Sequence, residues 1–448
     1  MTLDEAAEEA LHLAGRTTAT EAEVVGIESE VLEVGVRLQE TEKLKRARER
    51  RIAVRMFVGQ SSAVCSTADL GGDSLRSLVE TCQSLARSTA PDPFAGLPDG
   101  PDRSPSVADL ALYDESAERV SAEEAIAVAL AAEQAALAAD SRITNSEGAE
   151  FECAIHRLIY RTTRGVAGSY RTTSFSLSVV PVAAHEGRMQ QDYWYTTGRR
   201  RADLDSPESV GRTAATRALR RLGARPVSTR EVPVVFDPEM AATLVGHFAA
   251  AASGSSVYRG LSFLGGRLGQ PVGGDEVTLI DDPLLPGRLG SRPFDAEGMP
   301  TRRNVVAEHG VLRTYLLDTY AARKLGMTST ASAVRSFGDV PSAGSSNFYL
   351  ERGPVPPEEI VASVRDGFYV TELSGFGVNP VTGDYSRGAG GLWIESGKLT
   401  FPVEEVTIAG NLLEMLTSVE VIGNDLRFRS RTASPTLKIR RMTVAGAG

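Results

Sequence analysis

The chain has 448 residues, of which 42% are hydrophobic and 24% charged, so it has the composition of a globular protein long enough for two domains. Its net charge of −10 argues against direct binding to nucleic acid, because nucleic-acid binders usually carry a basic excess. No apolar run of about 18 residues occurs, and the acidic start MTLDEAAEEALHLAG lacks the features of a secretory signal, so we expect neither a membrane span nor export.

The first half of the sequence predicts helices that alternate with antiparallel strands. Residues 4–14 have the pattern of a short helix, and residues 22–66 alternate apolar and polar side chains with period two. That alternation predicts a meander of the strands AEVVGIES, VLEVGVRLQ and RIAVRMFVG. The charged run EKLKRARER before the last of these strands is predicted to be a solvated turn or a helix fragment.

Three further helices are predicted in the first half, at 73–88, at 121–139 and from Ser206 to Gly223. Ser121 can cap the second of these, and Glu124 completes a capping box. The Pro-, Gly- and Asp-rich stretch FAGLPDGPDRSP (94–105) predicts a surface connection, and residues 142–198 predict strands.

The cysteines are few, and none belongs to a CxxC pair. Cys65, Cys82 and Cys153 are scattered, which fits a reducing compartment, so we predict a cytoplasmic protein without a disulfide framework. Cys153 precedes His156 by three residues. On a strand two such side chains point to opposite faces, so they are not expected to form a nucleophile and base.

The only His-Glu dipeptide of the chain opens the stretch HEGRMQQD, residues 185–192. The zinc-peptidase motifs HExxH and HExxxH need a second histidine, but Met189 and Gln190 occupy those positions. The flanking residues have the pattern of two strands joined at Glu186 and Gly187. We therefore predict a polar hairpin turn here, without a metal.

The second half predicts a β-rich domain. RPVSTREVP (225–233) is predicted to be an interdomain linker, which divides the chain into domains at 1–226 and 227–448. One clear helix runs from Pro238 to about Ala252, capped by Asp237, and many short strands with glycine and proline turns follow it, along with a short helix at 355–364. The predicted class is α+β: an N-terminal α/β domain with antiparallel strands and long helices, and a C-terminal β-rich domain with one prominent helix.

No catalytic template is complete. The patterns G-x-S-x-G and G-x-x-x-x-G-K are absent, and so is G-x-G-x-x-G after a strand. The remaining histidines form no HxH, HxxxH or HxxE pair; they are His12, His156, His247 and His309. The sequence therefore predicts no catalytic residue and no metal ligand in this chain.

Several segments of the second half resemble the TldD/PmbA family, with the closer match to its PmbA (TldE) branch. The most specific run is VTGDYSRGAGGLWIESG followed by PVEEVTIAGNL, and SSVYRGLSFLGGRLGQPV, RPFDAEGMPTRRNVVAEHGVLRTYLLDTYAARKLG and IGNDL support it. The resemblance extends more weakly through the first half. SPTLKIRRMTVAGAG and SNFYLERGPVPPEEIVASVRDGFYV resemble TldD as much as TldE, which leaves the identity of a partner open.

The resemblance implies a role in a cytoplasmic heterodimeric metallopeptidase that cleaves unfolded or short peptides. In that family the TldD subunit carries an HExxxH motif on the first helix of its C-terminal domain and a later cysteine. The matching helix here is DPEMAATLVGHFAAAASG, which places Gly246 and Ala251 at the ligand positions and His247 at the glutamate position. No cysteine follows Cys153. The resemblance thus implies the metal-free subunit, with a zinc-type metal in a TldD-like partner.

A second group of polar residues lies among the glycines of the most specific run. We regard His247, Asn379, Asp384, Tyr385 and Arg387 as candidates that face a peptide or a partner, since glycines let another backbone approach closely. The alternative is that they hold turns of the β-domain together. Two other functions stay open: a homodimeric peptide-binding protein without hydrolysis, and an autonomous hydrolase that uses His247.

Overall fold

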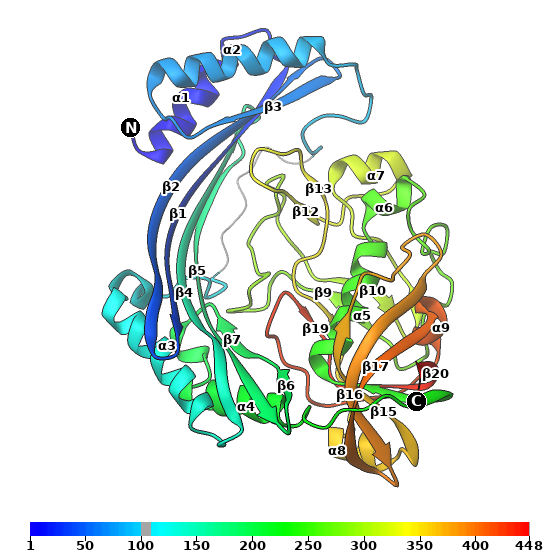
Figure 1. Ribbon diagram of the computed structural model, residues 1–448. Coiled ribbons are helices and arrows are strands. Elements are labelled where there is room, and N and C mark those ends of the chain that lie inside the picture. Colours follow the sequence, from blue (N-terminus) through cyan, green and yellow to red (C-terminus); the bar gives the residue numbers. More distant parts are fainter. Residues whose placement is uncertain (100–108, 448) are drawn as a thin grey trace.

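The N-terminal half is built on one large antiparallel sheet (Figure 1). The computed structural model describes residues 1–99 and 109–447, so part of the predicted connection 94–105 lies outside the described residues. The strand order is β3-β2-β1-β4-β5-β6, and β7 also pairs with β5. The strands are β1 (Glu21–Arg37), β2 (Glu40–Val58), β3 (Ser61–Thr67), β4 (Ile143–Thr162), β5 (Ala167–His185), β6 (Arg188–Gln191) and β7 (Trp194–Gly198).

Two pairs of helices cover opposite ends of the same face of this sheet. Helices α1 (Leu3–Gly15) and α2 (Gly72–Ser88) pack on one end, against a core that includes Val24. Helices α3 (Ala122–Leu137) and α4 (Pro207–Leu219) pack on the other end, where Val34 belongs to a second core. Both valines are even-numbered residues of β1 and share one face of that strand. The odd-numbered face is turned to the C-terminal half (Figure 1).

The charged run EKLKRARER is strand, not the turn or helix fragment predicted from the sequence. It forms the first half of β2, in register with the glutamate-rich middle of β1. Cross-strand ion pairs join the two strands: Arg48 contacts Glu28 at 2.7 Å, and Lys43 pairs with Glu33. Opposite charges across a strand pair stabilise a sheet where little apolar surface is buried, so the apolar alternation that marks a strand is missing here.

The two-residue turn between β1 and β2 is held by a buried carboxylate. Leu38 and Gln39 both have left-handed backbones, with φ of 50° and 65°. Glu133 of α3 is fully buried and accepts their backbone N–H groups at 2.9 and 2.8 Å. The contact fixes the hairpin against the helix.

Replacing Glu133 with alanine is expected to lower the free energy of unfolding by about 1–3 kcal/mol, because two backbone donors lose their charged acceptor. Urea unfolding measures this loss. Gln134 is exposed on the same helix, so Gln134→Ala is the matched control and should change stability little. A loss for Glu133→Ala no larger than that of the control would show that the turn holds its shape unaided.

The C-terminal half combines a six-stranded sheet, of order β17-β16-β15-β8-β20-β18, with a five-stranded sheet, of order β11-β10-β9-β14-β19. The prominent helix predicted after Asp237 is α5 (Pro238–Ala251), the longest helix of this half. The other helices are η1 (Glu115–Arg119) and η2 (Arg201–Asp203) in the first half, and α6 (Gly254–Tyr258), α7 (Thr319–Leu325), α8 (Pro357–Ala362) and α9 (Leu412–Thr417) in the second. The remaining strands are β8 (Ser228–Phe236), β9 (Leu279–Asp281), β10 (Asn304–Glu308), β11 (Val311–Leu312), β12 (Ala333–Val334), β13 (Ser342–Ala343), β14 (Phe348–Leu350), β15 (Asp366–Ser374), β16 (Asp384–Glu395), β17 (Lys398–Asn411), β18 (Val419–Ile422), β19 (Thr432–Ala433) and β20 (Leu437–Ala447).

The predicted linker 225–233 is largely wrong. From Ser228 onward this segment is β8, which lies inside the six-stranded sheet between β15 and β20. Its first four residues are exposed and polar, so the sequence shows no apolar period there. Their backbone still pairs with the end of β20, with Ser228 opposite Ala447. The class of fold is the predicted α+β, and the division at residue 226 stays a prediction.

A buried contact joins the two halves. Glu23 of β1 accepts a hydrogen bond from Arg335, in the loop after β12, at 2.6 Å, and a second from Tyr160 of β4 at 2.6 Å. Phe294 of the C-terminal half packs on Tyr160, with their ring centroids 6.5 Å apart. All four side chains are nearly inaccessible to solvent.

In the part of the chain that the structure describes, no helix is long and apolar enough to cross a membrane.

Candidate functional site

Three of the residues predicted to face a peptide or a partner meet beside helix α5. His247 lies on α5, and its ring stands edge-on to Tyr385 of β16 with centroids 6.4 Å apart. Arg387 lies two residues further along β16, on the same side of the strand. Buried polar atoms of all three side chains lack a hydrogen-bond partner among the described residues: His247 Nε2, the Tyr385 hydroxyl and Arg387 Nε.

This group of three is uncharged apart from the guanidinium. Burial lowers the pKa of His247, and the nearby charge of Arg387 lowers it further, so the imidazole is neutral at pH 7. Burial raises the pKa of Tyr385 to about 12, with Arg387 acting in the opposite direction. The group can donate and accept hydrogen bonds, but it contains no ionised base.

Of the other two candidates, Asn379 lies in the turn before β16 and Asp384 is the first residue of β16. The Asn379 side chain accepts the backbone N–H of Val381 at 3.0 Å, and Asp384 accepts the Thr382 hydroxyl at 2.6 Å. Hydrogen bonds from Thr382 and Asn411 lower the pKa of Asp384, which stays ionised. Unlike the three side chains around His247, these two have hydrogen-bond partners, within the turn and from Asn411 at the end of β17.

The positions of the family's metal motif on α5 do not fit a metal. Gly246 and Ala251 carry no donor, and the lone donor between them, His247, lies near the positive charge of Arg387, which disfavours a second cation. Among the described residues, no three His, Cys, Asp or Glu side chains are grouped to hold a metal ion. We derive no chemical step through a metal at this helix.

HEGRMQQD is the predicted hairpin turn. β5 ends at His185 and β6 begins at Arg188, and Glu186 and Gly187 between them have φ of 50° and 77°. A left-handed pair of this kind matches the twist of the two strands. Cys153 and His156 also point to opposite faces as predicted: Cys153 is buried under α3 and α4, whereas His156 lines a cavity on the other face.

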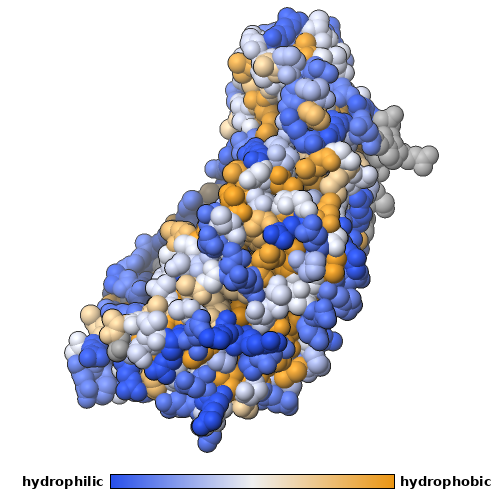
Figure 2. Space-filling view, turned by 90° about the vertical axis from the view of Figure 1, so that its right-hand side faces the viewer, coloured by the Kyte–Doolittle hydropathy of each residue, from blue (hydrophilic) through white to orange (hydrophobic). Residues whose placement is uncertain are grey.

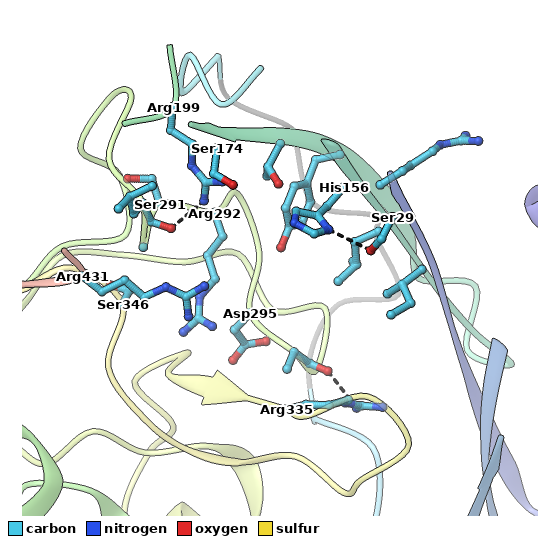
Figure 3. Close-up of a pocket in the computed structure, with 18 of the residues that line it drawn as sticks. Ser29, His156, Ser174, Arg199, Ser291, Arg292, Asp295, Arg335, Ser346 and Arg431 are labelled. Atoms are coloured by element: carbon cyan, nitrogen blue, oxygen red, sulfur yellow. Dashed lines mark hydrogen bonds between the residues drawn. The ribbon is translucent and has the colours of Figure 1, made fainter. Parts of the chain in front are cut away.

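That cavity has a volume of about 730 Å³ and lies between the large sheet and the C-terminal half. The sheet contributes a row of hydroxyls, Thr172, Ser174 and Ser176, at alternate positions of β5. Apolar side chains such as Ile27 and Phe294 line another part. Figure 3 shows polar side chains from both halves directed into one space.

The cavity carries an excess of positive charge. Six arginines line it, against the two acidic residues Glu152 and Asp295. Asp295 accepts three backbone N–H groups, from residues 297, 299 and 333; burial raises its pKa, and the nearby charge of Arg292 acts in the opposite direction. Three of the arginines have ion pairs elsewhere, with Asp4, Glu23 and Asp205. The other three are Arg199, Arg292 and Arg431, and none forms an ion pair within the described part of the chain.

Histidine 156 adds a neutral polar group to the same space. Its Nδ1 lies 2.8 Å from the Ser29 hydroxyl, a contact between adjacent strands (Figure 3). Removal from bulk water lowers the pKa of His156, and the charge of Arg199 lowers it further. The imidazole is therefore uncharged at pH 7 and can accept or donate one hydrogen bond.

Sequence reasoning missed this cavity. Its arginines come from β4, from the position just after β7 and from loops near residues 292, 335 and 431, so no local spacing links them. The one local signal is the stretch RTTSFSLS, in which small hydroxyls alternate with buried residues such as Phe175 and Leu177. A strand with one apolar face and one face of small hydroxyls indicates a polar space beyond it.

Comparisons with known proteins agree with the fold over the whole chain. Residues 115–222 match the PmbA/TldA metallopeptidase central domain, and residues 229–446 match the PmbA/TldA metallopeptidase C-terminal domain. Metalloprotease PmbA of Escherichia coli O157:H7 is 37% identical over 445 residues, which are 99% of this chain and 96% of that protein.

Two solved structures share the architecture. One is a Bacteroides thetaiotaomicron protein assigned as a candidate modulator of DNA gyrase, with a TM-score of 0.92, 30% identity and coverage of 99% of both chains. The other is TldE from Thermococcus kodakarensis, with a TM-score of 0.90 over 98% of this chain and 100% of that one; at 20% identity it is a likeness of fold. From the matched domains and the full-length identity, this chain belongs to the PmbA/TldD family of metallopeptidases, in its PmbA branch.

Proposed function

We propose that this chain is the metal-free subunit of a cytoplasmic, heterodimeric peptidase of the TldD/TldE type. A TldD-like partner supplies the zinc-type metal, its bound water and the general base that cleave unfolded or short peptides. The observation that carries the proposal is helix α5, where glycine and alanine occupy the positions that the family resemblance assigns to metal ligands. Arg387 supports the proposal as well. Its positive charge lies near His247 and would repel a divalent cation bound there.

Exposed apolar residues supply a surface for the partner. The side chain of Phe376 is fully exposed, and Leu261 and Val381 are about half exposed. The segments that carry them are joined by a hydrogen bond from the Phe263 N–H to the Pro380 carbonyl. Figure 2 shows apolar residues gathered over the middle of the face on the C-terminal side of the molecule. Aromatic and aliphatic groups exposed in this way are typical of protein interfaces.

The test is the metal content and peptidase activity of the pure chain, alone and mixed with a TldD-like protein from the same organism. We expect no stoichiometric metal and no cleavage for the pure chain, and both for the mixture. The TldD-like protein alone is the control that shows whether this chain is needed for cleavage.

Two results would contradict the proposal. A pure chain that binds about one metal per protomer and cleaves peptides would be an autonomous hydrolase, and loss of that activity in His247→Ala would place its site at α5. A chain that binds peptides as a homodimer, while the mixture forms no complex and cleaves nothing, would be a free-standing peptide-binding protein.

A further inference from the structure

The cavity between the two halves contains three guanidinium groups, of Arg199, Arg292 and Arg431, that form no ion pair within 4.0 Å with any described residue. Arg199 is 7% exposed, and its guanidinium donates hydrogen bonds to backbone carbonyl oxygens. Nη1 donates to the carbonyl of Thr173 at 2.9 Å, and Nη2 donates to the carbonyl of Leu289 at 2.5 Å. These bonds hold the group in place but leave its charge uncompensated. A buried charge without a partner is costly, so an anion that enters the cavity would be bound favourably.

The other two guanidiniums lie near the first. Arg292 has a buried Nε without a hydrogen-bond partner, and Arg431 is a surface arginine of the loop before β19. Figure 3 shows Arg199, Arg292 and Arg431 directed into the same end of the cavity. All three positive charges act on the hydroxyl of Tyr170, where they oppose the rise in pKa that burial causes. Three charges from separate segments therefore converge on one place.

The apolar and hydroxyl side chains that line the rest of the cavity indicate which kind of anion would fit it. Phe294 stands edge-on to Tyr170 with ring centroids 5.1 Å apart, and Ile27 and Leu158 line the same cavity, so an apolar group can be buried next to the charge. Hydroxyls such as Ser174 supply small, uncharged partners for amides. A ligand that matches this lining has one anionic end, an apolar side chain and a polar backbone.

We propose that the cavity binds the C-terminal carboxylate of a short peptide, with the carboxylate between Arg199, Arg292 and Arg431. The choice of a peptide rests on the proposed function, whereas the anion site rests on the cavity alone. Guanidinium groups bind carboxylates through paired, parallel hydrogen bonds, and the volume of about 730 Å³ is that of a site for a small ligand. The chain would then recognise the end of a peptide and align it for the partner's metal site.

The experiment measures binding of a fluorescein-labelled hexapeptide with a C-terminal leucine, as the free acid and as the amide, to the full chain. We expect the acid to bind at least about tenfold more tightly than the amide, and Arg292→Gln/Arg431→Gln to abolish this difference. Arg352→Gln/Arg427→Gln is the matched control, because it removes the same two positive charges from exposed arginines that do not line the cavity. Thermal unfolding of each variant checks that it is folded.

Equal binding of acid and amide by the wild type, or a preference that survives in the double variant, would overturn the proposal. If inorganic phosphate binds and is lost in the double variant, while neither peptide binds, the cavity is an anion site and the peptide assignment is wrong. Cleavage by the mixture with a TldD-like protein is scored separately. If the mixture cleaves peptides but the chain does not prefer the free acid over the amide, only this inference is wrong. If the chain prefers the free acid but the mixture cleaves nothing, only the proposed peptidase function is wrong.

Discussion

Replacing Arg335 with methionine is expected to lower the free energy of unfolding by about 3–5 kcal/mol, because the change strands a buried carboxylate. Arg335 is the closest cation to Glu23, at 2.6 Å, and Arg55 is the next at 3.8 Å. Burial alone would raise the pKa of Glu23, but the charges of Arg335 and Arg55 and the hydrogen bond from Tyr160 outweigh it and hold the pKa below its ordinary value. Without Arg335 the largest charge that offsets the burial of Glu23 is gone, so the ionised carboxylate is destabilised.

The double variant Glu23→Gln/Arg335→Met separates the ion pair from the packing. A glutamine can still accept the Tyr160 hydroxyl, but the buried Arg55 loses its ion pair with Glu23, so only part of the lost stability should return. Arg352→Met, at an exposed arginine, is the control and should change stability little. Urea unfolding measures all three. If Arg335→Met costs no more than the control, the contact between the halves does not depend on this pair.

The same pair predicts the acid limit of the protein. The pKa of Glu23 is lower in the folded chain than in the unfolded chain, so its contribution to stability is present above the ordinary glutamate value of about 4.5. It is lost as the pH falls through the lower, folded value. Arg335→Met should therefore cost most near neutral pH and less at low pH.

Local rules of sequence predicted the helices of this protein well. Ser121 and Asp237 cap α3 and α5 as expected, since each side chain accepts the N–H three residues on. The turn at Glu186 and Gly187 was predicted for the same reason: these rules involve residues that are close in the chain. The α+β class followed from the same elements.

The failures lie where strands are stabilised by distant residues. The β2 run EKLKRARER pairs with glutamates of β1, and the polar start of β8 pairs with the C-terminal end of β20, so neither has the apolar period of a half-buried strand. The cavity was not predicted from the sequence for a similar reason. Its residues Arg199, Arg292 and Arg431 are far apart in the chain and meet only in the tertiary fold. Of the candidates around α5, His247, Tyr385 and Arg387 meet, while Asn379 and Asp384 hold a turn.

Glu297→Gln is expected to stabilise the protein in a way that grows with pH. Glu297 is buried beside two other carboxylates, and it accepts the N–H and hydroxyl of Thr319 at 2.9 and 2.6 Å. Burial raises the pKa of Glu297 to about 8, and the charges of Asp295 and Asp318 raise it in the same direction. Glutamine keeps the size and the acceptor oxygen of Glu297 but cannot ionise.

The sign follows from linkage. A carboxyl whose pKa is higher in the folded chain than in the unfolded chain binds its proton more tightly when folded, so the wild type loses stability as the pH rises from about 4.5 through about 8. The slope is about 1.4 kcal/mol per pH unit within that window. The variant lacks this loss, so its advantage should be near zero at pH 4.5 and largest above pH 8.

Urea unfolding of Glu297→Gln and the wild type at pH 5, 7 and 9 tests this expectation. The exposed Glu276 supplies the matched control, and Glu276→Gln should follow the wild type at each pH. An advantage of Glu297→Gln that does not change with pH would mean that Glu297 keeps one protonation state across the range. A variant less stable than the wild type at pH 9 would mean that the ionised carboxylate is held by partners that an amide cannot replace. In that case hydrogen bonds to the ionised carboxylate would outweigh both its burial and the like charges of Asp295 and Asp318.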